Sequence, residues 1–184
     1  DNGYLFFNVT PVELKIDGDS VDVEMRITEG KPATFNNIII NGNTITSEKI
    51  ARRALYTRPG YLFSQSDFER SLRELASIGH FEAERAYSEA GYTLLPNQQN
   101  NTVDIAYNLV EKPNSQLELS GGWGGDTFVG TLGVSFNNFS VRRMFEKGAW
   151  RPVPLGDGQT LSIRFQTNGT YYTALSLSFM EPWL

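Results

Sequence analysis

Several features that the sequence lacks limit the classes of protein to which this chain could belong. Cysteine does not occur among the 184 residues, which excludes a disulfide framework and any metal site built on thiolates. The sequence has no run of 18 apolar residues, so no segment predicts a transmembrane helix. It starts at Asp1 without a charged segment followed by an apolar one, and we expect any signal peptide to have been removed. A hydrophobic content of 40% is that of a folded chain.

The net negative charge lies in the first part of the chain. Residues 1–114 carry 11 Lys and Arg against 16 Asp and Glu, a balance of −5, whereas residues 115–184 carry 5 of each. An acidic first part argues against nucleic-acid binding, which needs a basic face. The change near residue 114 indicates a change of environment for the second part.

The middle of the chain has the pattern of a small α+β domain. Phe35–Ile40 is a β-rich run, and Asn41-Gly42-Asn43 is typical of a turn. A helix is expected after Thr46 or Ser47, and Pro59-Gly60 interrupts it. The buried face of this helix is predicted to consist of Ile50, Ala51, Ala54 and Leu55.

A second helix is predicted to begin at Asp67, because Ser66 and Glu69 have the spacing of a capping box. Gly79 is placed to end it in the left-handed conformation that glycine favours. Its buried stripe is predicted at Phe68, Leu72 and Leu75.

Two alternating strands are predicted to close this domain. The first carries Phe81, Ala83, Arg85 and Tyr87, and the second carries Val103, Ile105, Tyr107 and Leu109. The order is therefore β-α-α-β-β, with two helices packed on a three-stranded sheet. We expect Phe35–Ile40 or Phe81–Glu89 to lie at a sheet edge whose free backbone groups accept an extended peptide.

Three motifs in this stretch resemble a known domain type. They are N-G-N followed after six residues by Ile50, then R-P-G-x-x-F from Arg58, then R-S-L-x-x-L-x-x-x-G-x-F from Arg70. The pattern resembles a POTRA domain, the periplasmic module of the BamA-type outer-membrane β-barrel assembly family. We assign residues 32–112 to one complete domain of this type.

An internal repeat extends the resemblance to the start of the chain. Tyr4–Lys15 and Val21–Thr28 flank Asp17-Gly18-Asp19, which predicts a β-hairpin. At an offset of 82 residues, Val21-Asp22-Val23, Ile27 and Glu29 match Val103-Asp104-Ile105, Leu109 and Glu111. Residues 1–31 are therefore expected to be the closing hairpin of a preceding POTRA domain.

Four long alternating strands follow the POTRA-like stretch. Their apolar and polar side chains alternate over about ten residues each, a length and pattern that fit transmembrane β-barrel strands. The strands are predicted at Gln116–Trp123, Thr127–Asn137, Gln159–Thr167 and Tyr171–Met180. A soluble antiparallel sheet or sandwich alternates in the same way and stays an alternative.

The resemblance supports the barrel interpretation. Leu155-Gly156-Asp157-Gly158 resembles the family's Leu-Gly-x-Gly turn, and Met180-Glu181-Pro182-Trp183-Leu184 resembles the end of its fourth barrel strand. Residues 113–184 are therefore expected to be the first four strands of an outer-membrane β-barrel. Because four strands cannot close a barrel, we expect further strands outside this sequence.

The connection from Asn138 to Gln159 is long for a turn between barrel strands. It combines aromatic and basic residues, which predicts a short amphipathic helix at the membrane interface; a polar loop is the alternative. The interfacial residues are predicted to be Arg142, Arg143, Phe145, Lys147, Trp150 and Arg151.

Residues for enzyme chemistry are scarce. His80 is the only histidine, and no Ser-His-Asp set suggests itself around it, so a structural role is expected. The run from Gly121 to Gly125 lacks the G-K-[ST] ending of a phosphate-binding loop. We expect no enzymatic activity, no catalytic residue, no metal site and no cofactor.

The resemblance implies a function in folding and inserting β-barrel proteins, through POTRA docking and a lateral gate at the first barrel strand. The gate residues, which would pair with a client strand, are Gln116, Leu117, Glu118, Leu119, Ser120, Gly121, Gly122 and Trp123. The implied partners are unfolded outer-membrane β-barrel clients, accessory assembly lipoproteins, periplasmic chaperones and outer-membrane lipid, with no nucleic acid. The implied location is the bacterial outer membrane, with the POTRA domains in the periplasm.

Two other functions fit the same sequence. A related secretion or translocation pore, of the two-partner-secretion type or like the translocation-and-assembly protein TamA, shares POTRA domains and a barrel. A soluble binding module with a POTRA-like domain and a β-sandwich is the third possibility.

Overall fold

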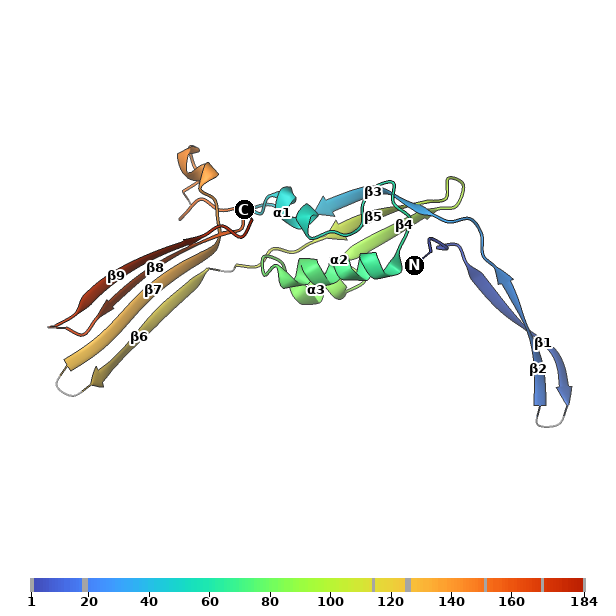
Figure 1. Cartoon of the computed structure of the whole chain (residues 1–184), viewed down its shortest axis with the longest axis horizontal. Coiled ribbons are helices and arrows are strands. Elements are labelled where there is room, and N and C mark those ends of the chain that lie inside the picture. Colours follow the sequence, from blue (N-terminus) through green and yellow to red (C-terminus); the bar gives the residue numbers. More distant parts are fainter. Residues whose placement is uncertain are drawn as a thin grey trace.

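The molecule is elongated, and a different sheet occupies each of its three parts (Figure 1). The computed structural model describes residues 2–17, 20–113, 115–124, 127–150, 152–169 and 171–183. A two-stranded sheet lies at one end, a layered α+β unit in the middle and a four-stranded sheet at the other end. Within the described ranges no helix is long and apolar enough to cross a bilayer.

The central unit is a three-stranded mixed sheet with helices on one face (Figure 1). Its strand order is β3-β5-β4, with β3 parallel to β5 and β4 antiparallel to it. The elements, in chain order, are β3 (Thr34–Asn41), α1 (Glu48–Arg53), α2 (Gln65–Ser77), α3 (Ala83–Tyr87), β4 (Tyr92–Asn97) and β5 (Thr102–Asn108).

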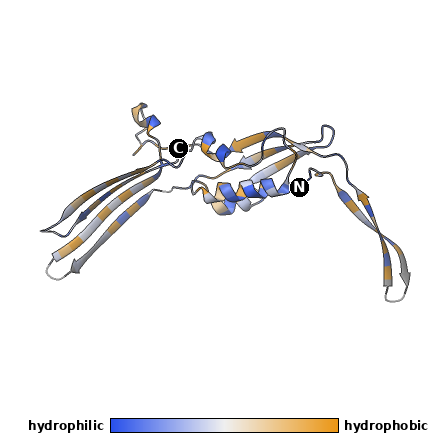
Figure 2. Ribbon diagram, in the orientation of Figure 1, coloured by the Kyte–Doolittle hydropathy of each residue, from blue (hydrophilic) through white to orange (hydrophobic). Residues whose placement is uncertain are grey.

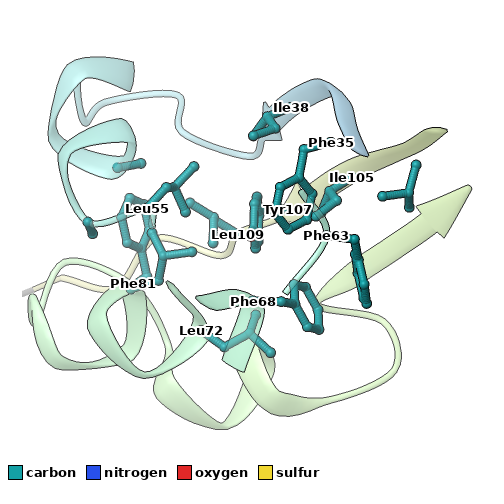
Figure 3. Packing of buried hydrophobic residues seen from close by; sticks show 14 of the residues in the cluster. Phe35, Ile38, Leu55, Phe63, Phe68, Leu72, Phe81, Ile105, Tyr107 and Leu109 are labelled. Carbon is teal, nitrogen blue, oxygen red and sulfur yellow. The ribbon is translucent and has the colours of Figure 1, made fainter. Parts of the chain in front are cut away.

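The hydrophobic core lies between this sheet and the helices (Figure 3). The predicted stripe of α2 is confirmed, since Phe68, Leu72 and Leu75 are buried. The predicted alternation of β5 is also confirmed: Val103, Ile105 and Tyr107 are fully buried, and the residues between them are half-buried. The predicted face of α1 is buried at Ile50, Ala51, Ala54 and Leu55.

The strand predicted over Phe81–Tyr87 is wrong. Phe81 is buried and forms only an isolated bridge with Glu111, and the chain then turns into the short helix α3. The antiparallel strand is instead β4, which follows α3 and for which no strand was predicted. Gly91 makes the return possible, because a Cβ at that position would lie 2.0 Å from the carbonyl oxygen of Arg85.

The start of α2 also differs from the prediction. The helix begins at Gln65, two residues early, and its N-cap is Ser64 rather than Ser66. Ser64 Oγ accepts a hydrogen bond of 3.2 Å from the backbone N–H of Asp67, which satisfies one of the free donors of the first turn. The predicted end is confirmed: Ile78 caps the helix, and Gly79 follows with φ +82°.

The N-terminal hairpin pairs β1 (Asn8–Asp17) with β2 (Ser20–Thr28). The predicted hairpin is present, although Gly18 and Asp19 of its turn lie outside the described residues. One face carries exposed apolar side chains, among them Val23, Met25 and Ile27. No element of the described chain covers this face.

The C-terminal sheet is an antiparallel meander in the order β6-β7-β8-β9. Its strands are β6 (Gln116–Gly124), β7 (Thr127–Phe139), β8 (Gln159–Thr167) and β9 (Thr173–Met180). The four predicted segments therefore form strands, with β7 two residues longer than expected and β9 starting two residues later. Between β7 and β8, the predicted amphipathic helix is a single 3-10 turn, η1 (Arg142–Phe145).

Candidate functional site

Strand β6 is an edge strand that holds all eight residues predicted to pair with a client. Each residue from Gln116 to Trp123 is exposed. In the described part of the chain, β6 pairs with β7 on one side and with no strand on the other. Its outer edge therefore presents a row of backbone N–H and C=O groups for an added strand.

One face of this sheet is apolar and exposed. Side chains from the four strands meet in cross-strand rows, of which Leu117, Val134, Ile163 and Leu177 form one. Leu117 and Leu177, in the two edge strands, are each 72% exposed. Figure 2 shows hydrophobic residues recurring along all four strands. The opposite face carries small and polar residues, such as Ser135 and Ser162, whose hydroxyl oxygens lie 2.8 Å apart.

Aromatic rings cover the glycine-rich end of β6. A Cβ at Gly121 would lie 2.8 Å from Phe128 Cζ, and one at Gly130 would lie 3.0 Å from Cε1 of the same ring. Trp123 packs edge-to-face on Phe128 with ring centroids 5.5 Å apart. The two glycines thus leave the space that the Phe128 ring occupies, as in other sheets where an aromatic side chain covers a cross-strand glycine.

A second notable site is the joint where the C-terminal sheet meets the central unit. Here the Glu111 carboxylate accepts hydrogen bonds from the N–H and Oγ1 of Thr44 (3.0 and 2.7 Å) and from the N–H groups of Ile45 (2.9 Å) and Thr46. Burial alone would raise the pKa of Glu111, but these hydrogen bonds outweigh it and hold the pKa below its ordinary value. The carboxylate therefore fixes the loop that follows β3.

The turn before β8 docks on that loop. Asn138 Nδ2 donates to Thr46 Oγ1 (2.9 Å), and the N–H of Ser47 donates to the carbonyl of Gly156 (2.8 Å). Asn138 Oδ1 also accepts from the N–H of Gly158 (2.9 Å). Gly156 has φ +132°, and a Cβ there would lie 2.7 Å from the carbonyl oxygen of Ile45. Only glycine fits this contact.

His80 is a buried residue of the same joint. A Cβ at Gly158 would lie 3.2 Å from His80 Nε2, so the turn before β8 packs against the imidazole. Burial lowers the pKa of His80 most; nearby Glu111 raises it and Lys112 lowers it, with a net decrease. Among the described residues, no group of three or more His, Cys, Asp or Glu side chains is placed to hold a metal ion.

The described interfacial residues are all exposed: Arg142, Arg143, Phe145, Lys147 and Trp150. Arg142 forms an ion pair with Asp157 (3.2 Å), and Arg143 binds Glu146 (3.2 Å) and the carbonyl of Leu155 (2.8 Å). These arginines therefore fold the loop. Trp150 also contributes to the loop, because its Nε1–H donates to the carbonyl of Met144 (3.0 Å), and Arg151 lies outside the described residues.

The predicted peptide-binding edge of the central sheet is only partly as expected. Strand β3 lies at an edge, but backbone groups on its outer side already have partners. The N–H of Phe35 donates to the carbonyl of Tyr61, and the carbonyl of Phe35 accepts from the N–H of Gly60. Arg52 Nη2 donates to the carbonyl of Ile38 (3.1 Å). Phe81–Glu89 is not a strand. The open edge of the described sheet is β4, because β4 pairs with β5 alone.

Comparison with known proteins identifies the central unit. Residues 33–112 match the family model described as "POTRA: Surface antigen variable number repeat". The crystal structure of BamA from Haemophilus ducreyi lacking POTRA domains 1–3 shares the fold over 100% of this chain and 31% of its own, with a TM-score of 0.71 and 21% identity. The central unit is a POTRA domain.

Curated relatives carry the comparison further. Outer membrane protein assembly factor BamA of Neisseria meningitidis is 26% identical over 183 residues, which are 98% of this chain and 20% of the relative. BamA of Neorickettsia risticii is 28% identical over 139 residues, or 75% of this chain and 18% of the relative. The chain thus spans about a fifth of these relatives. The resemblance seen in the sequence is confirmed: this is a POTRA-containing chain related to outer membrane protein assembly factors named BamA.

Proposed function

We propose that this chain belongs to a factor that folds and inserts β-barrel proteins in the bacterial outer membrane, with β6–β9 as the first four strands of its transmembrane barrel. The observation that carries this proposal is the C-terminal sheet, which exposes one apolar face, has a polar face opposite and leaves both edges unpaired in the described chain. In a barrel wall, the apolar face contacts lipid, the polar face lines the lumen and neighbouring strands pair both edges.

The dimensions of the sheet support this role. Strands β6, β7, β8 and β9 have 9, 13, 9 and 8 residues. A tilted strand needs about 9–11 residues to cross the hydrocarbon core, whereas strands in soluble domains average about 5–6. A sandwich would instead bury the apolar face against a second sheet, and none of the described elements covers it.

The N-terminal hairpin supports the proposal that another POTRA domain precedes the complete one. The repeat matches Val23, Met25 and Ile27 of β2 to Ile105, Tyr107 and Leu109. The first three are exposed, and their three counterparts are buried under helices. An apolar face of this kind needs a similar cover, so we assign residues 1–31 to the closing hairpin of another POTRA domain, residues 32–112 to the complete one and residues 113–184 to barrel strands.

The partners follow from this role. Clients are unfolded outer-membrane β-barrel proteins, which pair with β6 at the lateral gate and are delivered through the POTRA domains. Accessory assembly lipoproteins and periplasmic chaperones dock in the periplasm, and outer-membrane lipid surrounds the barrel. The work is strand pairing and insertion, so we assign no catalytic residue and no cofactor.

Client crosslinking tests the gate. A cysteine replacing Leu117 in β6 is expected to crosslink to the last strand of a stalled client in cells. Leu177→Cys is the matched control, because Leu177 has the same 72% exposure in the same cross-strand row but lies in β9. Equal crosslinking at both positions, or none at Leu117, would exclude the gate. A secreted passenger rather than a barrel client at Leu117 would instead identify a secretion pore.

Thiol labelling tests the topology and the interfacial loop. A cysteine at Lys147 is expected to resist a membrane-impermeant reagent in intact cells and to react after the outer membrane is permeabilised. Tyr171→Cys, 82% exposed at the other end of the sheet, is expected to react in intact cells. The reverse pattern would invert the proposed orientation.

A further inference from the structure

The four strands of the C-terminal sheet contain two charged residues, and these two contact each other. Glu118 is in β6 and Arg164 is in β8. Arg164 Nη2 lies 2.8 Å from Glu118 Oε2 on the polar face of the sheet. The ion pair therefore joins the edge strand to the strand beyond its neighbour.

A glycine makes this contact possible. Gly133 of β7 is paired with Glu118 on one side and with Arg164 on the other, so the three residues form one cross-strand row. A Cβ at Gly133 would lie 3.1 Å from Glu118 Oε2 and 3.2 Å from Glu118 Cβ. Strands two apart are separated by roughly 9–10 Å, twice the usual spacing, and the side chains span that distance across a position with no side chain.

Other side-chain contacts hold β6 only loosely. Leu117 and Leu119 are 72% and 79% exposed, so they lose little water-accessible surface to β7. Gly121 and Gly122 contribute no side chains, and the one aromatic contact, Trp123 on Phe128, lies at the far end of the strand. Apart from its backbone pairing with β7, the first half of β6 is tied to the described sheet by Glu118.

We infer that the Glu118–Arg164 pair is a latch that holds the first half of β6 in line with the sheet, and that its release lets the open edge of β6 bend toward a client while β6 stays paired with β7. The inference rests on the proposed function, because it assigns the latch to the strand that pairs with clients. It gives the two side chains a positioning role: the backbone of Glu118 pairs with the client, and its side chain, held by Arg164, sets how readily β6 bends.

Hydrogen exchange measures the latch without a client. In the membrane-reconstituted protein, Glu118→Gln and Arg164→Gln are each expected to speed amide exchange across residues 116–120 by about two- to fivefold, in line with the coupling of exposed ion pairs. The double variant is expected to exchange no faster than either single one, because both remove the same contact. The charge-swapped pair Glu118→Arg with Arg164→Glu is expected to restore slow exchange in β6.

Two controls separate the latch from general loosening of the sheet. Ser162→Ala removes the Ser135–Ser162 hydrogen bond between β7 and β8 and is expected to leave exchange in β6 unchanged. Raising the salt from 0.05 M to 0.5 M, which shortens the screening length roughly threefold, is expected to speed exchange in the parent protein but not in the Gln variants. Additive effects of the two Gln substitutions, or single variants that exchange like the parent, would overturn the latch.

Client crosslinking then links the latch to function. With cysteine at Leu117, Glu118→Gln is expected to raise the yield of the client crosslink relative to the parent. Faster exchange in β6 with an unchanged crosslink yield would overturn the role assigned to the latch while leaving the gate intact. A client crosslink absent from every variant, despite coupled exchange at Glu118 and Arg164, would refute the proposed function and keep the latch as a property of the sheet.

Discussion

The central POTRA domain and the C-terminal sheet place their large apolar side chains in opposite ways. In the POTRA domain, Leu75 and Phe81 are fully buried between helices and sheet. In the C-terminal sheet, Leu119 and Leu175 point away from the protein. The first domain supplies its own cover, whereas the second needs one from its surroundings. The difference teaches that the same alternating pattern in sequence describes either a core or a contact surface, depending on what packs against it.

Cavity formation provides the strongest test of this contrast. Leu75→Ala in the POTRA core is expected to lower the free energy of unfolding by about 2–5 kcal/mol, because the lost contacts leave a cavity. Helical circular dichroism during chemical denaturation measures it, since the described α-helices, α1, α2 and α3, all lie in this domain. Leu119→Ala is the matched control and is expected to change the same transition by less than about 0.5 kcal/mol. Similar losses for both would erase the distinction.

The glycine contact in the joint is the next largest effect. Gly156→Ala places a Cβ 2.7 Å from the carbonyl oxygen of Ile45 at φ +132°, and backbone strain of this kind costs about 1–3 kcal/mol. We expect a broader distance distribution between spin labels on the POTRA domain and the C-terminal sheet. Gly148→Ala is the control, because Gly148 also has a positive φ, +84°, but no atom lies within 4 Å of its Cβ position. An unchanged distribution in Gly156→Ala would show that the turn does not fix the joint.

Acid should weaken the same joint in a defined order. Because its folded pKa is lowered, neutral His80 stabilises the joint at high pH, and this contribution fades as the pH falls below the unfolded value of 6.5 and through the folded pKa. The lowered pKa of Glu111 likewise gives stability that is present above the unfolded value of 4.5 and is lost as the pH falls through its folded pKa. Glu111→Gln is expected to cost about 1–3 kcal/mol at neutral pH and to remove the lower transition. Spin-label distances measured from pH 8 to pH 3 check both steps. A single step shared by the parent and Glu111→Gln would contradict this assignment.

A cation–π contact gives the smallest effect. Arg53 of α1 lies over the Trp183 ring, 5.4 Å from its centroid, and so links the POTRA domain to the end of β9. Arg53→Met keeps most of the side-chain length, and we expect it to weaken the joint by about 0.5–1 kcal/mol. The fluorescence of Trp183 reports the change when it is measured in a variant whose other tryptophans have been replaced by Phe. Arg70→Met disrupts a similar contact on Tyr56 within the POTRA domain and should leave that fluorescence unchanged.

Local patterns in the sequence predict most elements but not where the chain turns back. The stripe of α2, the alternation of β5 and the four long strands follow from side-chain periodicity, which the fold preserves. The segment Phe81–Tyr87 alternates as well, yet Phe81 enters the core and the next residues form a helical turn, because Gly91 brings the chain against Arg85. That close approach is a tertiary contact, and no local pattern encodes it.

The candidate site was predictable where it depends on local sequence and not where it depends on contacts between distant residues. The exposed length of β6 follows from its alternation, and the glycines of the Leu155–Gly158 turn follow from its resemblance to known turns. Sequence reasoning missed the Glu111 carboxylate, although the match between Glu29 and Glu111 in the repeat was a usable signal. It also missed the ion pair of Glu118, since the partner is 46 residues away and the pairing depends on strand register. The placement of Arg142 and Arg143 at the membrane interface stays a prediction; the sequence did not reveal the Asp157 partner of Arg142, which is 15 residues away.

The covered edge of β3 has a consequence for stoichiometry. Residues 60–63 and Arg52 occupy its outer backbone groups, so the POTRA sheet keeps one open edge, at β4. A sheet with two open edges can grow by adding strands on both sides and propagate from molecule to molecule. A sheet with one open edge can bind one added strand. A bound extended segment therefore occupies the last free edge, and two POTRA domains that paired edge to edge would form a dimer with no free edge left.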